Sequence, residues 1–132
     1  MANNFFTIDE AQENVQWLAE TCKEIGPLRK QASTLHDEIR LLVDRMGGNG
    51  GRKSHDHLVK LNNDMQEVSS QIEKVVDSIS QRGILVKSMD PGLVDFPSTR
   101  DDREVYLCWK EGEDQIRYWH NIESGFAGRK PI

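Results

Sequence analysis

Residues 47–51 (GGNGG) separate two long stretches in which apolar residues recur at alternating spacings of three and four. No other run in the chain is so rich in residues that tolerate positive φ, so a helix cannot continue through it. Two helices joined by such a tip fold back on each other as an antiparallel pair. The sequence therefore predicts a long helical hairpin, with helices over residues 7–46 and 54–81 and a glycine tip between them.

The first helix begins at a capping box formed by residues 7–10 (TIDE). The Thr7 hydroxyl accepts from the backbone N–H of Glu10, and the Glu10 carboxylate accepts from the N–H of Thr7. The apolar stripe that follows resumes one position early after Ile25, at Leu28. This short step coincides with Gly26-Pro27, so we expect a kink there or, alternatively, a break into two helices.

The two helices differ in length, at about 60 Å and about 40 Å for a rise of ~1.5 Å per residue. The second helix ends level with residues 19–22 of the first, so the start of the first helix needs another cover. The segment 84–132 supplies it, because its apolar period changes from helical to two, which predicts strands. We expect an α+β fold in one structural domain: a coiled-coil-like hairpin (residues 1–83) capped by a small antiparallel sheet of three or four strands. The expected strands are 84–88, 93–96, 103–110 and 115–121.

A two- or four-residue loop within residues 111–114 gives the same register for the last two strands, in which Lys110 pairs with Gln115. One face of that pair then carries Val105, Leu107, Trp109, Ile116, Tyr118 and His120. The other face carries Tyr106, Cys108, Arg117 and Trp119. We expect the first face to pack on the first helix near Trp17, and the second to be amphipathic.

The formal net charge of −5 argues against nucleic-acid binding, because phosphate-tracking surfaces are built from clustered Lys and Arg. Two cysteines are too few for a disulfide framework or a four-thiolate zinc site. No apolar window approaches the ~20 residues of a membrane span, so we expect a soluble, cytoplasmic protein. His55 and His57 point in different directions on a helix, and a polar helix entry explains them better than a metal. We therefore expect no metal and no cofactor.

Five ordered strings of residues resemble one family. They are FFTIDEA (5–11), GLVDFP (92–97), EVYLCWKEGE (104–113), IRYWH (116–120) and GFAGRKPI (125–132). Together they are similar to the bacterial family catalogued as domain of unknown function 2203. The resemblance implies a bacterial, cytoplasmic protein and no particular activity. The matching positions carry no assigned roles: Asp95, Glu104, Cys108, Trp109, Glu111, Trp119, His120, Gly125, Phe126 and Arg129.

A candidate ligand-binding site comprises Asp95, Glu104, Trp119, His120 and Arg129. A carboxylate, histidine and arginine cluster beside tryptophan suits a small anionic or carbonyl ligand. Structural roles compete at each position. His120 is also explained as a boundary histidine bonded to a carbonyl, and Asp95 as a turn or cap partner.

Two further residues near the candidate site have simpler explanations. Arg129 is expected to form a salt bridge with Glu104 or Glu111. Cys108 is expected to be strand packing rather than a nucleophile, although its predicted neighbour Arg117 would lower the thiol pKa.

Two helices of this length cannot bury both apolar stripes unaided, so we expect a homodimer whose hairpins form a four-helix bundle. The favoured function is a non-enzymatic oligomeric interaction or scaffold protein, which docks a protein partner through the amphipathic sheet face or the hairpin tip. The alternative is a small-molecule or metal-binding domain, or an enzyme, with a site around His120. The sequence indicates no reaction or substrate.

Overall fold

The heptad stripes form helices and the period-two segment forms strands in the computed structural model, which describes residues 5–47, 51–89 and 91–132. This is the α+β fold that the sequence predicts. Residues 48–50 of the predicted tip and Asp90 of a predicted turn lie outside the described residues. The elements are α1 (Ile8–Glu13), α2 (Val15–Met46), α3 (Arg52–Ser80), β1 (Leu85–Met89), β2 (Gly92–Arg100), β3 (Arg103–Lys110), β4 (Tyr118–Asn121), η1 (Phe126–Gly128) and β5 (Lys130–Pro131).

The chain divides into two compact units. The sheet unit comprises Met1–Lys23 and Val76–Ile132, so it contains α1, the start of α2, the end of α3 and all the strands. The hairpin unit comprises Glu24–Val75, and consists of the remaining parts of α2 and α3.

The first helix of the sheet unit starts as predicted but is shorter than predicted. The Thr7 hydroxyl accepts from the N–H of Glu10 at 3.1 Å, and the Glu10 carboxylate accepts from the N–H of Thr7 at 2.9 Å. At Asn14 the helix is interrupted by a turn, and α2 begins one residue later. The Asn14 side chain donates to the Glu10 carbonyl at 2.9 Å, so it competes with the backbone for a helical acceptor. The predicted continuous helix is wrong at this residue.

The sheet is antiparallel throughout, with its strands in sequence order from β1 to β5. The predicted end of the second strand at Pro97 is wrong, because β2 continues to Arg100. β1 pairs with β2 only as far as Asp95, so on this side Pro97 lies at an edge of the sheet. The N–H that proline lacks therefore removes no hydrogen bond between strands. The turn after β2 is tight: Asp101 and Asp102 have φ of 52° and 60°, as a two-residue type I′ hairpin requires.

The pairing of β3 with β4 differs by one residue from the prediction. Leu107 pairs with Trp119 and Cys108 with Tyr118, and β4 begins only at Tyr118. A longer loop, 111–117, precedes it and is held by Glu113. The Glu113 carboxylate accepts from the backbone N–H of Lys110 at 2.8 Å, and its carbonyl accepts from the indole of Trp109 at 2.8 Å.

A shift of one residue turns every side chain of β4 to the opposite face. Trp119 therefore shares the inner face of the sheet with Leu107, whereas His120 shares the outer face with Cys108 and Tyr106. The predicted assignment of His120 to the core face and of Trp119 to the amphipathic face is wrong for this reason.

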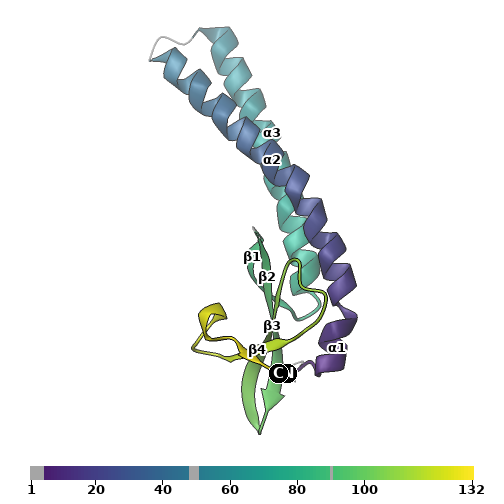
Figure 1. Cartoon of the computed structure of the whole chain (residues 1–132). Helices are drawn as coiled ribbons and strands as arrows, with labels where there is room; N and C mark the ends of the chain where they lie inside the picture. Colours follow the sequence, from purple (N-terminus) through teal and green to yellow (C-terminus); the bar gives the residue numbers. More distant parts are fainter. Residues whose placement is uncertain (1–4, 48–50, 90) are drawn as a thin grey trace. The chain divides into compact units, whose positions relative to one another are not determined.

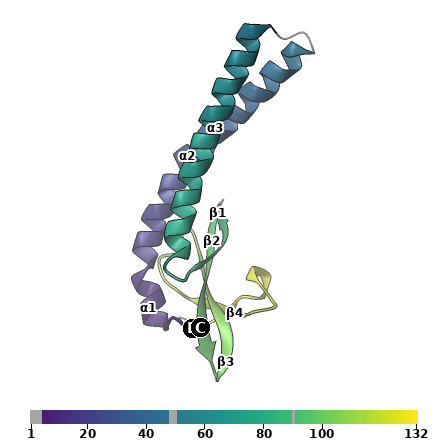
Figure 2. The ribbon, with the colours of Figure 1, turned by 180° about the vertical axis from the view of Figure 1, so that it is seen from behind.

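The inner face of the sheet packs with α1 and the adjoining helix ends into one apolar core. Figures 1 and 2 show these helices on one side of the strands and the C-terminal segment with η1 on the other. Trp17 packs against this core, as expected. Its buried members are Ala11, Val15, Leu18, Cys22, Ile79, Ile84, Val94, Phe96, Val105, Leu107, Trp109, Ile116 and Trp119.

The hairpin unit consists of two antiparallel helical segments that lie side by side (Figures 1 and 2). Helix α2 continues through Pro27, so the alternative of a break there does not occur. Leu35, Leu61 and Val68 are buried between the helices. Among the described residues, no helix combines the length and the hydropathy needed to cross a bilayer.

Candidate functional site

A buried acid and a buried histidine meet on the outer face of the sheet. Asp95 lies on β2 and His120 on β4, the two strands that flank β3. The Nε2 of His120 lies 2.9 Å from Oδ1 of Asp95, and the two side chains are only 2% and 4% exposed. Burial of an ionisable pair is costly unless each group keeps its partner, so this contact is specific rather than incidental.

The second ring nitrogen of His120 fixes the orientation of the imidazole. Nδ1 lies 2.8 Å from the backbone carbonyl of Asn121, and a carbonyl oxygen only accepts, so Nδ1 carries a proton and donates it. A single further proton then lies between Nε2 of His120 and Oδ1 of Asp95. The pair is therefore either imidazolium with carboxylate or neutral imidazole with carboxylic acid.

Cys108 completes the cluster from the central strand. It is the cross-strand partner of Asp95, is fully buried, and its thiol is hydrogen-bonded to the Asp95 carboxylate. Burial raises the pKa of Cys108 to about 12; Arg129 opposes this rise, and the carboxylates of Asp95 and Glu113 add to it. The ligand atoms of Asp95, Cys108 and His120 all lie within 4.8 Å of one another. We refer to these three residues as the outer-face cluster.

Arg129 lies near the outer-face cluster and is held by an acid that the sequence analysis did not select. Its Nη2 donates to both carboxylate oxygens of Glu113, at 2.6 and 2.8 Å, and its guanidinium stacks 4.0 Å from the ring centre of Tyr118. Its Nε is buried and has no hydrogen-bond partner in the described part of the chain. The predicted salt bridge to Glu104 or Glu111 is wrong, because the Glu111 carboxylate accepts instead from the backbone N–H of Gly92 at 2.9 Å.

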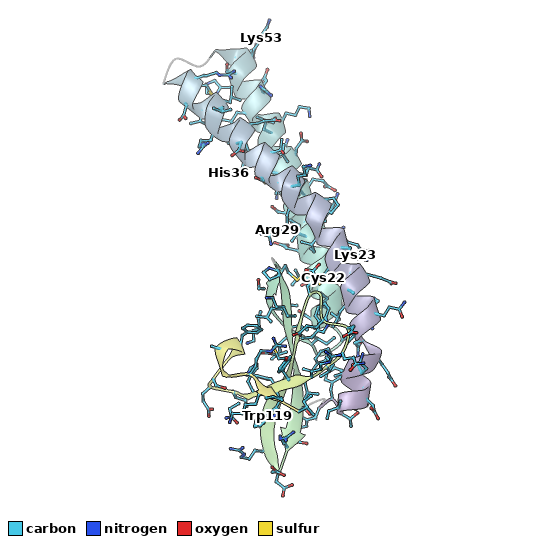
Figure 3. The ribbon with its side chains drawn as sticks, viewed as in Figure 1. Cys22, Lys23, Arg29, His36, Lys53 and Trp119 are labelled. Carbon is cyan, nitrogen blue, oxygen red and sulfur yellow. The ribbon has the colours of Figure 1, made fainter. Side chains whose placement is uncertain are left out.

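The other two predicted site residues lie elsewhere in the sheet unit. Glu104 is exposed and pairs with Thr99 near the β2–β3 turn. Trp119, labelled in Figure 3, belongs to the inner-face core, and the guanidinium of Arg100 lies 4.8 Å from its ring centre. The structure thus brings Asp95 and His120 into contact and places neither Glu104 nor Trp119 with them.

Cys108 and Glu113 are the residues of this region that sequence reasoning missed. One signal for Cys108 was present in the sequence. If the strand that contains GLVDFP continues through Pro97 and pairs with the strand that follows it, Cys108 lies directly opposite Asp95. Glu113 had no comparable signal, since its role depends on how the 111–117 loop turns back over the sheet.

A cleft of about 210 Å³ opens on the same outer face. Leu93 precedes Asp95 by two residues and Lys110 follows Cys108 by two, so the cleft lies two residue pairs along the same strands, at the next pair that faces outward. A larger open cleft of about 630 Å³ contains Glu13, Glu113 and Asp114, but no member of the outer-face cluster. The smaller cleft is lined by Ser88, Pro91, Leu93, Lys110 and Phe126.

Comparison with protein-family models matches residues 4–132 to the family described as "Uncharacterized conserved protein (DUF2203)". The chain belongs to the DUF2203 family. The match covers nearly the whole chain and confirms the resemblance seen in the sequence. Comparison of this DUF2203 chain with curated proteins and with solved structures gave no match. The description of the DUF2203 family contains no activity, so a function has to be argued from the geometry.

Proposed function

We propose that this protein is a non-enzymatic, oligomeric interaction protein whose hairpin unit pairs with that of a second copy to form a four-helix bundle. The supporting observation is that the two helices only half-cover their own apolar stripes. A second hairpin completes this burial in the way that bundle cores do. The side chains left partly exposed are Leu28, Ala32, Ile39, Leu42, Met65 and Ile72.

One side of the hairpin unit suits such a contact. On α3, Glu73 is the one charged residue among the hairpin-unit positions that directly follow the stripe residues, and Val59 among these positions is 58% exposed. In an antiparallel helix pair, positions one after the stripe lie on the same side of both helices. Val43 of α2, 48% exposed, therefore lies on this side too, and so do the charged residues Arg29 and Arg40. We call it the Val59 face; its α3 positions are Val59, Asn62, Gln66, Ser69 and Glu73.

The opposite side of the hairpin unit has the character of a solvated surface. Its α3 positions directly precede the stripe residues and include an ion pair between Lys60 and Asp64 at 3.0 Å. Charged groups are costly to bury in an interface core, and the Val59 face carries fewer of them than the opposite side, so it is the more favourable one. The α3 positions on the charged side are His57, Lys60, Asp64 and Glu67.

Light scattering after size exclusion tests the proposal at micromolar protein. We expect a mass of about twice 15.1 kDa for the natural chain. The double variant Val43→Glu, Val59→Glu introduces buried charges into the interface and is expected to be a monomer. The control is Leu41→Glu, which places one such charge at a residue that is 50% exposed on the opposite side, and it should remain dimeric.

A natural chain that elutes as a monomer, or a double variant that stays dimeric, would overturn the dimer. Circular dichroism of each variant shows whether the helices remain formed, so loss of the dimer is not confused with unfolding.

A second candidate function, a small-molecule or metal-binding domain around His120, is favoured by one observation. The outer-face cluster buries an ionisable pair outside the inner-face apolar core, where packing alone does not require it. Native mass spectrometry of the purified protein tests this candidate: a bound mass that is lost in His120→Asn supports it, and a bare chain mass under all native conditions contradicts it.

A further inference from the structure

We infer that Asp95, Cys108 and His120 form a three-ligand site for a divalent zinc-class ion. The inference rests on the second candidate function and is independent of the dimer. Its ligand atoms are Oδ1 of Asp95, Sγ of Cys108 and Nε2 of His120. All three residues are at least nine-tenths buried, at 3%, 0% and 2% exposure.

The imidazole of His120 is oriented as a metal-ligating histidine is. Its Nδ1 donates to the Asn121 carbonyl at 2.8 Å, which leaves Nε2 as the nitrogen that faces Asp95. Ligating histidines are commonly fixed by such an outer hydrogen bond, which sets the tautomer and the ring direction. Because the three ligands come from three adjacent strands of one sheet, their backbone positions are rigid.

The spacing of the ligand atoms is close to that of a tetrahedral site. Metal–ligand bonds of about 2.0–2.3 Å place neighbouring tetrahedral ligand atoms about 3.3–3.8 Å apart. The ligand atoms of the cluster lie within 4.8 Å of one another, and Nε2 and Oδ1 are 2.9 Å apart. The largest separation therefore exceeds the tetrahedral spacing by at most about 1 Å, and the separation of Nε2 from Oδ1 is about 0.4 Å below it.

The ligand types select the class of ion. One thiolate, one imidazole and one carboxylate suit zinc or a similar late first-row ion, whereas calcium and magnesium need sets of oxygen ligands. In the metal-free chain, protons occupy the places of the metal, one between His120 and Asp95 and one on the Cys108 sulfur. A divalent ion that displaces both protons leaves a carboxylate and a thiolate as ligands. Their two negative charges balance the charge of the ion, so the buried site is neutral.

Neighbouring groups do not oppose this charge balance. The positive charge of Arg129 is already paired with Glu113 through two hydrogen bonds. Three protein ligands leave one tetrahedral position for water or a small ligand. The cleft of about 210 Å³ lies on the same face, at the next outward-facing residue pair of β2 and β3, Leu93 and Lys110.

Titration of the metal-free full-length protein with Zn²⁺ and Co²⁺ alone tests the site. We expect one ion per chain by isothermal titration calorimetry, and a thiolate-to-cobalt charge-transfer band in the near ultraviolet. In Cys108→Ala the band is expected to disappear and the affinity to fall at least about 100-fold, beyond the range seen when only an outer-shell partner is lost. The matched control is Cys22→Ala, which removes the other buried thiol and should leave band and affinity unchanged.

A protein that binds neither ion at micromolar concentration, or a Cys108→Ala variant that keeps the charge-transfer band, overturns the site. Should Cys108→Ala fail to fold, X-ray absorption of the zinc-loaded natural protein decides: a shell with one sulfur and nitrogen or oxygen neighbours supports the assignment, and a shell without sulfur refutes it. If a bound organic molecule appears in native mass spectra but no metal binds, this inference fails while the second candidate function stands.

Discussion

Gly92 begins β2 at a place where the chain has no room for a side chain. A Cβ added there would lie 2.7 Å from the sulfur of Cys22 and 3.1 Å from a carboxylate oxygen of Glu111. Both neighbours are constrained: Cys22 is buried on α2, where Figure 3 labels it, and the Glu111 carboxylate accepts from the N–H of Gly92 itself. We expect Gly92→Ala to destabilise the protein by about 1–3 kcal/mol, as overpacking of a close-packed core does.

Urea unfolding followed by circular dichroism measures the effect. With a slope of about 1.5 kcal/mol/M, a loss of about 2 kcal/mol lowers the midpoint by roughly 1.3 M. Because the sulfur of Cys22 is the closest atom, Cys22→Ala in the same chain opens the required space. The loss of unfolding free energy in the double variant should then be smaller than the sum of the two single-variant losses by about 1 kcal/mol or more. This difference is within the range of coupling between contacting residues.

A matched control comes from Gly26, which lies in the interior of α2 with no atom within 4 Å of an added Cβ. Gly26→Ala should stabilise the chain by about 0.4–1 kcal/mol through the entropy of the unfolded state. The steric reasoning is refuted if Gly92→Ala is as stable as the natural chain, or if the effects of Gly92→Ala and Cys22→Ala simply add.

Three other stability changes follow from single contacts. Thr7→Ala removes the cap of α1 and should lower the free energy of unfolding by about 0.5–2 kcal/mol in urea titrations; no change would contradict a stabilising capping box. Replacing Asp101-Asp102 by Asn-Gly suits the two positive φ angles better, and we expect thermal melting to move upward rather than downward. Burial raises the pKa of Cys22 from 9.0 to about 11, with the Glu111 carboxylate adding to it. The unfolded thiol therefore ionises first, and stability due to Cys22 should fall between about pH 9 and 11; a Cys22→Ala variant with the same alkaline slope in urea midpoints contradicts this.

The helices were predictable because their signals are local and repeated. The capping box at Thr7 and the glycines at residues 47–51 mark where the first helix begins and ends, and each apolar stripe repeats over many turns. The interruption at Asn14 was not predictable from periodicity, because one side-chain hydrogen bond to the Glu10 carbonyl leaves the apolar stripe unchanged.

The outer-face cluster was only half predictable, because it depends on strand register. Period two identifies strands but cannot distinguish pairings that differ by one residue. The deciding contacts are long-range or arise within a loop: Gln12 accepts from the N–H of Ile116 at 2.8 Å, and Glu113 folds back onto β3. Asp95 and His120 were therefore selected by residue type, whereas Cys108 required the register.

The 111–117 loop leads into β4, a strand that serves both faces of the sheet. His120 and Trp119 are adjacent residues that belong to opposite faces, one to the outer-face cluster and one to the inner core. If β4 shifted by one residue relative to β3, His120 would take the place of Trp119 in the core and Trp119 would turn to the outer face. A shift by two residues would restore the alternation of faces but would move His120 away from Asp95, so only the observed register serves both the core and the outer-face cluster.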